Sequence, residues 1–272
     1  MTGRSRSCRC GRMTGTGILA LVFLGSLSAS GDDGGREVFA DDFDDGAAEA
    51  WSHTQVTTTP NQQATILGRF TNHSVELSLT DLPKHRWVEV RADLLIVRTW
   101  DGGQGPDLLT IGVDGGPRLL HATFRNGDPN KPTEPSERSA SYPDEHPYAR
   151  RPPSLGAAAT DTLGFTNNKA TVDDSTYDLR FVFPHQGDGL TVRFTGQNLQ
   201  RVPDESWGLD AVRVLVHERS PVAPLTPAQL DRGVEALTTS DPVEAIEQMW
   251  TLVGQGDRAV KPLLAGLILS GE

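Results

Sequence analysis

Cysteine is almost absent from this chain of 272 residues. Its two cysteines, Cys8 and Cys10, both precede a short apolar run at 18–30. Segment 1–30 carries four arginines ahead of that run and small residues at its end, which is the pattern of a secretory signal peptide. The remaining chain contains no cysteine, so an exported domain built from it must be stabilised by its core or by a metal ion.

Long apolar runs are also missing. The run at 18–30 falls short of the roughly 20 residues that a membrane-spanning helix needs. We therefore expect no membrane span after removal of the signal peptide, and a secreted, periplasmic or cell-surface location.

Basic residues are few in relation to acidic ones. Without segment 1–30 the chain keeps 21 lysines and arginines against 36 acidic residues, so its formal charge changes from −11 to −15. A surface this acidic disfavours nucleic acids and anionic membranes as partners.

Catalytic motifs are equally scarce. The seven histidines form no H-E-x-x-H pattern, and there is no G-x-S-x-G sequence. Glu205 with Asp107 are a conceivable carboxylate pair for glycoside hydrolysis, although nothing in the sequence fixes their separation. We therefore expect a protein that is not an enzyme, with a polysaccharide-active hydrolase or lyase as the alternative.

The most regular feature of the sequence is alternation of apolar and polar residues between 36 and 219. Segments 86–97 and 177–183 are the clearest examples. Such period-two segments, bounded by glycine, proline, asparagine and aspartate, are typical of half-buried strands. About ten of them predict a mainly β fold, an antiparallel jelly-roll β-sandwich. Gly-Asp-Gly at 187–189 predicts a hairpin turn.

Three short runs combine acids with glycine and an aromatic residue: DDFDDG (41–46), WDGGQGPD (100–107) and PDESWGLD (203–210). The last run ends at Asp210, which has the same parity as the alternating valines that begin at Val212. A lone carboxylate on a core face is costly unless it is paired or bound to a metal. Either Asp210 caps a turn at the strand's edge, or it binds a hard cation such as calcium.

Several of these segments carry a family resemblance. DDFDDGAAEAW, VRADLLIVRTWDGGQGPD and DESWGLDAVRV look like parts of an exported bacterial jelly-roll family. That family is similar to calcium-stabilised carbohydrate-binding modules of the galactose-binding-like or concanavalin-like kind. The resemblance implies that an acid after the first strand and an acid starting the last strand hold one structural Ca²⁺. Asp44 and Asp210 match these positions, and Asp42 is a nearby substitute.

The segment 125–161 has seven prolines and no periodicity. A loop this long is either a surface excursion or functional. In the functional interpretation its aromatic and basic residues cover a ligand cleft, because ring faces and arginines suit sugars. The candidate ligand-binding residues are Trp100, Tyr142, Tyr148 and Arg150. We therefore expect an exported, non-catalytic glycan-binding or cell-surface module, with a purely structural envelope protein as a further alternative.

The last part of the chain has a different pattern. A proline-rich linker at 220–225 precedes segment 226–272, which has helical periodicity in three short stripes. Thr226 and Pro227 open the first of these with a helix start signal. The segment resembles HEAT-like helical repeats, and one such unit does not bury its own apolar stripe. We therefore predict three short helices that pack on the sandwich, pair with a second copy or continue into a longer chain beyond Glu272, and we expect them to serve for protein contact.

Overall fold

The computed structural model describes residues 35–102, 105–128, 139–166 and 172–237, together with residues 248, 249 and 252. The predicted signal peptide at 1–30 lies outside these described residues. Within the described part of the chain, no helix has the length and apolar character needed to cross a membrane.

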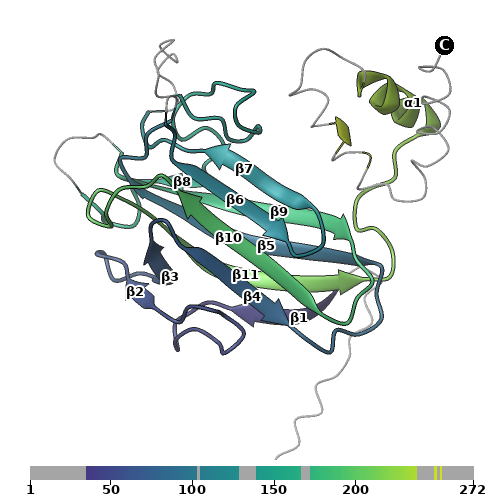
Figure 1. The fold of residues 1–272 in the computed structure, drawn as a ribbon, viewed down its shortest axis with the longest axis horizontal. Coiled ribbons are helices and arrows are strands. Elements are labelled where there is room, and N and C mark those ends of the chain that lie inside the picture. The colour runs from purple at the N-terminus through teal and green to yellow at the C-terminus, as the bar shows by residue number, and fades with distance from the viewer. Residues whose placement is uncertain are drawn as a thin grey trace, which may run out of the picture. The chain divides into compact units, whose positions relative to one another are not determined.

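The described residues form eleven strands and one helix (Figure 1). All pairings between the strands are antiparallel. The elements are β1 (Arg36–Asp41), β2 (Val56–Thr58), β3 (Thr65–Phe70), β4 (Ser74–Leu79), β5 (Trp87–Arg98), β6 (Leu108–Val113), β7 (Arg118–Thr123), β8 (Ala159–Thr160), β9 (Asp174–Pro184), β10 (Leu190–Gln197), β11 (Glu205–His217) and α1 (Pro227–Ala236).

The strands form two sheets, which we call the large sheet and the small sheet. The large sheet has the order β2-β3-β11-β5-β9-β8, and β1 also pairs with β11. The small sheet has the order β4-β10-β6-β7. Side chains of both sheets belong to one buried cluster, so the sheets face each other as a β-sandwich. The predicted antiparallel β-sandwich is confirmed as the architecture, and the jelly-roll connectivity stays a prediction.

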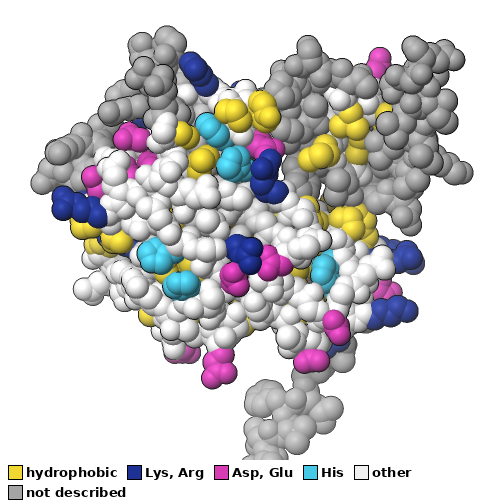
Figure 2. Space-filling model, in the orientation of Figure 1, with side chains coloured by type: hydrophobic (Ala, Val, Ile, Leu, Met, Phe, Trp, Pro, Cys, Tyr) yellow, Lys and Arg dark blue, Asp and Glu magenta, His cyan; other side chains and the backbone are white. Residues whose placement is uncertain are grey.

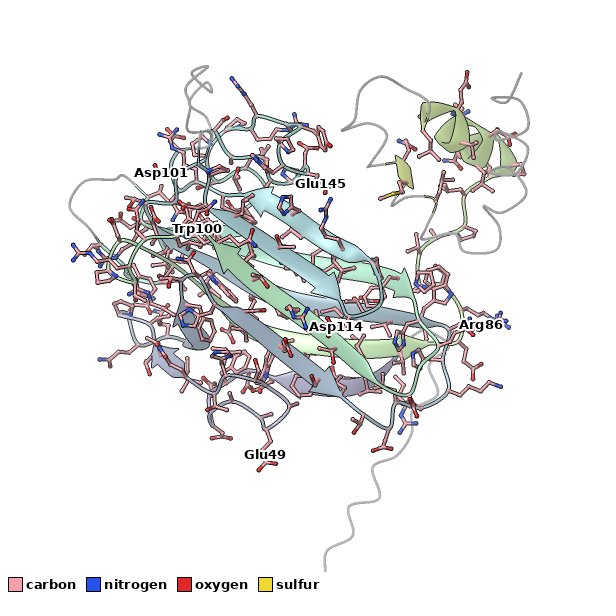
Figure 3. The ribbon with its side chains drawn as sticks, viewed as in Figure 1. Glu49, Arg86, Trp100, Asp101, Asp114 and Glu145 are labelled. Atoms are coloured by element: carbon pink, nitrogen blue, oxygen red, sulfur yellow. The ribbon has the colours of Figure 1, made fainter. Side chains whose placement is uncertain are left out.

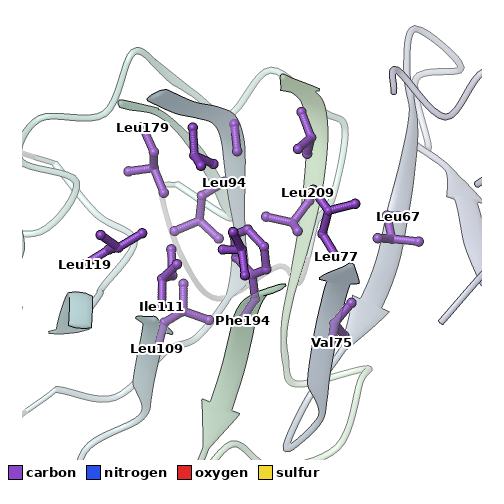
Figure 4. Close-up of a cluster of buried hydrophobic side chains, with 14 of the residues drawn as sticks. Leu67, Val75, Leu77, Leu94, Leu109, Ile111, Leu119, Leu179, Phe194 and Leu209 are labelled. Carbon is purple, nitrogen blue, oxygen red and sulfur yellow. The ribbon is translucent and has the colours of Figure 1, made fainter. Parts of the chain in front are cut away.

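The core between the sheets follows from the alternation in the sequence. Leu94 of β5 is fully buried, and so are Ile111 of β6 and Phe194 of β10. Figure 4 shows such side chains from both sheets meeting in the space between the strands. Burying one side chain of this size stabilises the fold by about 1.5–3 kcal/mol. The period-two segments therefore become strands because only that spacing turns every second side chain to the same side.

A β-bulge in β11 changes the face on which Asp210 lies. The register against β5 shifts between Asp210 and Arg213, and Ala211 within the shift has a φ of 47°. Leu209 before the bulge and Val212 after it are both in the core. Asp210 therefore lies on the outer face of the large sheet, and the expectation that it shares the valine face is wrong. An extra residue in one strand reverses the alternation of the residues that follow it.

The bulge leads to a test at Ala211, whose side chain is exposed. Replacing Ala211 by glycine is expected to change the free energy of unfolding by less than about 1 kcal/mol, because glycine adopts a positive φ without steric cost but loses more entropy on folding. Ala211→Val is expected to lower it by about 1–3 kcal/mol, because a β-branched residue is strained at positive φ. Urea unfolding of both variants measures the difference, and equal stability of the two would contradict the bulge.

The Gly-Asp-Gly segment at 187–189 does not form the predicted hairpin. β9 before it belongs to the large sheet and β10 after it belongs to the small sheet, so the segment carries the chain between sheets. A hairpin does join β6 to β7, where the N–H of Gly116 donates to the carbonyl of Val113 at 2.9 Å. Glycine permits tight turns in both kinds of connection, so it does not by itself distinguish them.

Helix α1 begins as predicted. Thr226 is its N-cap, and the Thr226 side chain accepts from the backbone N–H of Gln229. The Gln229 side chain in turn accepts from the backbone N–H of Thr226, and Pro227 occupies the first helical position. This reciprocal pair satisfies two donors that the first turn of a helix leaves without partners.

The described residues support one helix in the C-terminal segment and not three. The buried side chains associated with α1 are Leu230, Val234 and Leu252. The other two apolar stripes, within 246–253 and 260–267, lie almost entirely outside the described residues. Met249 of the second stripe is described, and it is 41% exposed. The predicted three-helix, HEAT-like segment is therefore not supported.

Candidate functional site

Four carboxylates gather on the outer face of the large sheet, beside the end of the first strand. Asp42 and Asp44 follow β1, which is paired with β11. Asp210 lies at the bulge of β11, and Asp93 of β5 is its cross-strand partner. The negative charges of the other three carboxylates all act on Asp210. The structure thus brings the three predicted calcium ligands near one another and adds Asp93. The sequence does not reveal Asp93 as a neighbour, because it does not show the register in which β5 pairs with β11.

The electrostatics of this carboxylate group are unfavourable. The pKa of Asp210 is raised to about 6, first by burial and then by the charges of Asp93, Asp44 and Asp42. Burial also raises the pKa of Asp93, and the charge of Asp178 on β9 adds to that effect. Excess negative charge at a half-buried site is relieved when a cation or a proton binds there.

The chemistry of the donors suits calcium, which takes carboxylate and backbone oxygens from loops. Within the described residues, however, no three histidine, cysteine, aspartate or glutamate side chains are arranged so that they could hold one metal ion. Asp41 has a different role. Its carboxylate accepts from the N–H groups of Phe43 and Ala48 at 3.0 and 2.9 Å, and from Nε1 of Trp51 at 3.1 Å. It orders the loop that carries the two acids after β1.

Two of the predicted ligand-binding aromatic residues lie inside the protein. Trp100 is 1% exposed, and its Nε1 donates to the carbonyl of Ser206 at 2.9 Å. Tyr142 is half-buried and stacks on Phe124, with ring centroids 4.9 Å apart. Its ring also lies edge-on to that of Tyr177. The expectation of a sugar contact at Trp100 is corrected here, because the ring has no exposed face to offer.

The other two predicted ligand-binding residues lie on the surface. Tyr148 is 53% exposed, and Arg150 is exposed as well. Both belong to a loop whose ends are joined by a bridge between Ala140 and Arg151. Residues 129–138, before this loop, lie outside the described part of the chain. The described part of segment 125–161 therefore has regular hydrogen bonding at its base and an exposed aromatic residue near its end.

This loop is fixed to β7 at two points. The N–H of His146 donates to the carbonyl of His121 at 2.8 Å. The guanidinium of Arg118, at the start of β7, pairs with the carboxylate of Glu145. Figure 3 shows Glu145 beside the end of the small sheet. The loop is therefore held against the sheet edge, which lowers the entropy that a ligand must remove when it binds.

A row of polar side chains crosses the outer face of the small sheet and reaches this loop. The row contains Ser74, Thr195, Thr110 and His121, which are successive cross-strand partners. The hydroxyls of the first two are 3.1 Å apart, and the Thr110 hydroxyl is 2.8 Å from Nδ1 of His121. Figure 2 views the molecule as in Figure 1, with the small sheet in front, and shows histidines on this face together with basic and acidic side chains that lie next to each other. The same face carries Arg193 of β10, which pairs with Glu76 of β4 and with Asp114, so it offers many hydrogen-bonding groups and its charges are paired.

The two histidines of this surface are biased toward the neutral form. Burial lowers the pKa of His121, and the positive charges of Arg118 and His146 lower it further. Burial also lowers the pKa of His146. A neutral imidazole has one donor nitrogen and one acceptor nitrogen, which suits an uncharged hydroxyl.

The conceivable catalytic pair, Asp107 and Glu205, does not have the geometry of a glycoside hydrolase. The two carboxyl groups are hydrogen bonded to each other, and each side chain is 1% exposed. A retaining enzyme needs about 5–5.5 Å between its carboxyl groups and an inverting enzyme about 6.5–9.5 Å. A sugar does not fit between two groups in direct contact.

No protein-family model matches the sequence, and no curated protein sequence matches it either. Three solved structures with partial likeness have TM-scores of 0.33, 0.28 and 0.27. They are the dimeric latent PorU of Porphyromonas gingivalis, the exo-beta-1,3-galactanase of Phanerochaete chrysosporium with beta-1,3-galactotriose, and the catalytic domain of Agl-KA.

The sequence identities to these three proteins are 10%, 10% and 12%. The matches cover 59%, 66% and 70% of this chain, but only 12%, 29% and 29% of the other chains. The chain thus spans less than a third of each of them. TM-scores below 0.5 at such low identity give no information about the function of this chain. The function is therefore inferred from its own residues.

Proposed function

We propose that this protein is an exported, non-catalytic glycan-binding module whose binding surface is the loop around Tyr148 together with the polar row of the small sheet. The observation that carries the proposal is the exposure of Tyr148 on a loop that is held against β7. An exposed ring stacks on the apolar C–H face of a sugar. The hydroxyls and imidazoles of the adjacent row supply donors and acceptors for sugar hydroxyls.

The composition of this surface favours an uncharged ligand. Arg118 is already paired with Glu145, and the lowered pKa values of the two histidines make them neutral near pH 7. Arg150 adds one exposed cation beside the aromatic residue. A neutral polysaccharide with several hydroxyls along one face fits such a surface better than a highly charged polymer does.

The proposal includes a structural calcium ion held by Asp42, Asp44 and Asp210, with Asp93 as a further donor. Two observations support this calcium ion. The four side chains offer carboxylate oxygens, and negative charge accumulates around Asp210. A divalent cation at this position would link the end of the first strand to the bulge of the last strand. It would stabilise the scaffold and take no part in contacts with the ligand.

Export and a role of the C-terminal segment in protein contact are also part of the proposal. Export is supported by the arginine-led apolar run in 1–30. The partner contact is supported by the apolar stripes of 226–272.

Replacing Tyr148 by alanine is expected to weaken binding to the best glycan on an array by about tenfold or more, which corresponds to about 1.4 kcal/mol. The reason is that alanine removes the stacking surface. Tyr148→Phe keeps the ring and is expected to retain most of the affinity. Isothermal titration with the soluble form of that glycan measures the difference.

The matched control is Val56→Ala, which removes an exposed apolar side chain from β2 in the large sheet. Affinity should be unchanged in that variant. If Tyr148→Ala and the wild type bind the glycan with equal affinity, Tyr148 is not part of the glycan-binding site. Release of shortened sugars from bound polysaccharide would show an enzyme instead of a binding module.

A further inference from the structure

Two of the acidic runs in the sequence meet at one end of the sandwich. The N–H of Thr99 donates to the carbonyl of Asp204 at 3.1 Å, and its hydroxyl donates to the carboxylate of the same residue at 3.1 Å. Trp100 then reaches the carbonyl of Ser206. Figure 3 shows Trp100 and Asp101 close together at this end. Residues 99–102 and 105–107, which we call the acidic loop, are therefore attached to the start of β11.

At the centre of this contact lie two buried carboxyl groups. Asp107 and Glu205 are each 1% exposed, and their side chains are hydrogen bonded to each other. An oxygen of Asp107 also accepts from the N–H of Asp101 at 2.5 Å, and an oxygen of Glu205 accepts from the N–H of Gln200 at 2.7 Å. Two ionised carboxylates have no hydrogen to share. A hydrogen bond between them therefore requires a proton on one of the two groups.

We propose that Asp107 and Glu205 hold one proton between them and form an acid-dependent lock between the acidic loop and the start of β11. The lock is closed when the pair carries the proton. Loss of the proton leaves two negative charges in contact and out of water, and this repulsion loosens the loop from the strand. Neither group takes part in the proposed glycan or calcium site.

The charged surroundings of the pair favour retention of the proton. Burial raises the pKa of Asp107 to about 7, and the charges of Glu205 and Asp101 contribute to the increase. Burial also raises the pKa of Glu205, with the charges of Asp101 and Asp204 contributing. The charges that act on the pair are those of other carboxylates, and they favour the protonated form, whereas the N–H groups of Asp101 and Gln200 and, for Glu205, the hydrogen bond with Asp107 lower the pKa values.

Arg98 and Arg201 belong to the turns beside the pair, and Arg69 of β3 donates to the hydroxyl of Ser206 at 2.8 Å. An Nη1 donor of Arg98 bonds to the carbonyl of Pro203 at 2.9 Å. The backbone carbonyl of Arg201 accepts from the N–H groups of Asp204 and Glu205. These contacts engage the backbone of the turn, and the carboxyl oxygens of the pair are satisfied by backbone N–H groups and by each other.

The direction of the pH dependence follows from the raised pKa. The folded protein binds the proton more tightly than the unfolded chain, in which an aspartate has its ordinary pKa near 3.8. The contribution of the pair to the free energy of unfolding is therefore complete below about pH 3.8, decreases as the pH rises from there, and is lost as the pH passes through about 7. Asp210 and the other carboxylates with raised pKa values also make the free energy of unfolding decrease as the pH rises. The test must therefore compare variants with the wild type.

The experiment is thermal unfolding between pH 5 and pH 8, with chelator present, of the wild type, Glu205→Gln, Asp107→Asn and Asp45→Asn. We expect the melting temperature of the wild type to fall by about 5–10 °C over this range. The first two variants should show a clearly smaller fall and should melt no lower than the wild type at pH 8. Either amide donates the hydrogen bond that the shared proton makes, and it does so at any pH. Asp45→Asn changes an exposed carboxylate and should keep the wild-type slope.

If the melting temperature falls equally with pH in the wild type and in both amide variants, the proposed lock is wrong. The proposal would also fail if calcium, added at pH 8, raised the melting temperature of the wild type and of Asp210→Asn but not of Glu205→Gln, because the pair would then be a cation site. Should neither amide variant fold, carboxyl-carbon NMR of the wild type decides the question. A titration step near pH 7 in the carboxyl-carbon signals of Asp107 and Glu205 supports the shared proton, and the absence of that step contradicts it.

Discussion

Saturating calcium is expected to raise the free energy of unfolding of this protein by about 3–4 kcal/mol, at 100 to 1,000 times its dissociation constant. The reason is that the ion would bind the folded arrangement of Asp42, Asp44, Asp93 and Asp210 but not the unfolded chain. Asp210→Asn is expected to abolish this increase, because the amide has nearly the same size but lacks the negative charge that the ion needs. Thermal or urea unfolding with calcium and with chelator measures the effect.

The matched control for calcium is Asp114→Asn, in the turn after β6 of the small sheet. This aspartate is half-exposed and pairs with Arg193, so its replacement should leave the calcium dependence intact. Asp93→Asn is expected to weaken the dependence, since its charge acts on Asp210. Wild-type stability that is indifferent to chelator would show that the four carboxylates hold no structural cation.

Trp100→Ala is expected to lower the free energy of unfolding by about 3–5 kcal/mol, the usual cost of removing a buried tryptophan. The ring is 1% exposed and packs edge-on against Phe124, with centroids 5.9 Å apart. Its loss also leaves the carbonyl of Ser206 without the donor that it has in the folded protein. Equilibrium unfolding in urea measures the loss.

Two further variants separate packing from ligand contact. Trp100→Phe keeps part of the buried volume and should cost less than the alanine variant. Tyr148→Ala, on the exposed loop, should change stability by less than about 0.5 kcal/mol. A stable Trp100→Ala protein with lost glycan binding would contradict the core role and restore Trp100 as a ligand contact.

Local alternation in the sequence was sufficient to locate most of the strands. Segments 86–97 and 177–183 correspond closely to β5 and β9. The start of α1 was equally clear, because Thr226 and Pro227 act within one helical turn. Each of these features depends on residues that are neighbours in the chain.

The partners of the strands could not be obtained in the same way. Gly-Asp-Gly at 187–189 predicted a hairpin, yet it joins strands of different sheets. Alternation placed Asp210 on the valine face, and the bulge at Ala211 reversed that assignment. A bulge is set by the pairing of a strand with its neighbours, and those neighbours are distant in sequence.

The sequence by itself determined the period-two strands, the capped helix and the acidic runs, because spacing along the chain governs which side chains share a face. Only the tertiary structure decided which carboxylates meet. Asp93 lies beside Asp210 because β5 and β11 pair in one register, and Asp107 reaches Glu205 because residues 99–102 and 105–107 contact the start of β11. Register and loop closure are collective results of burying one core between two sheets, so no short stretch of sequence contains them.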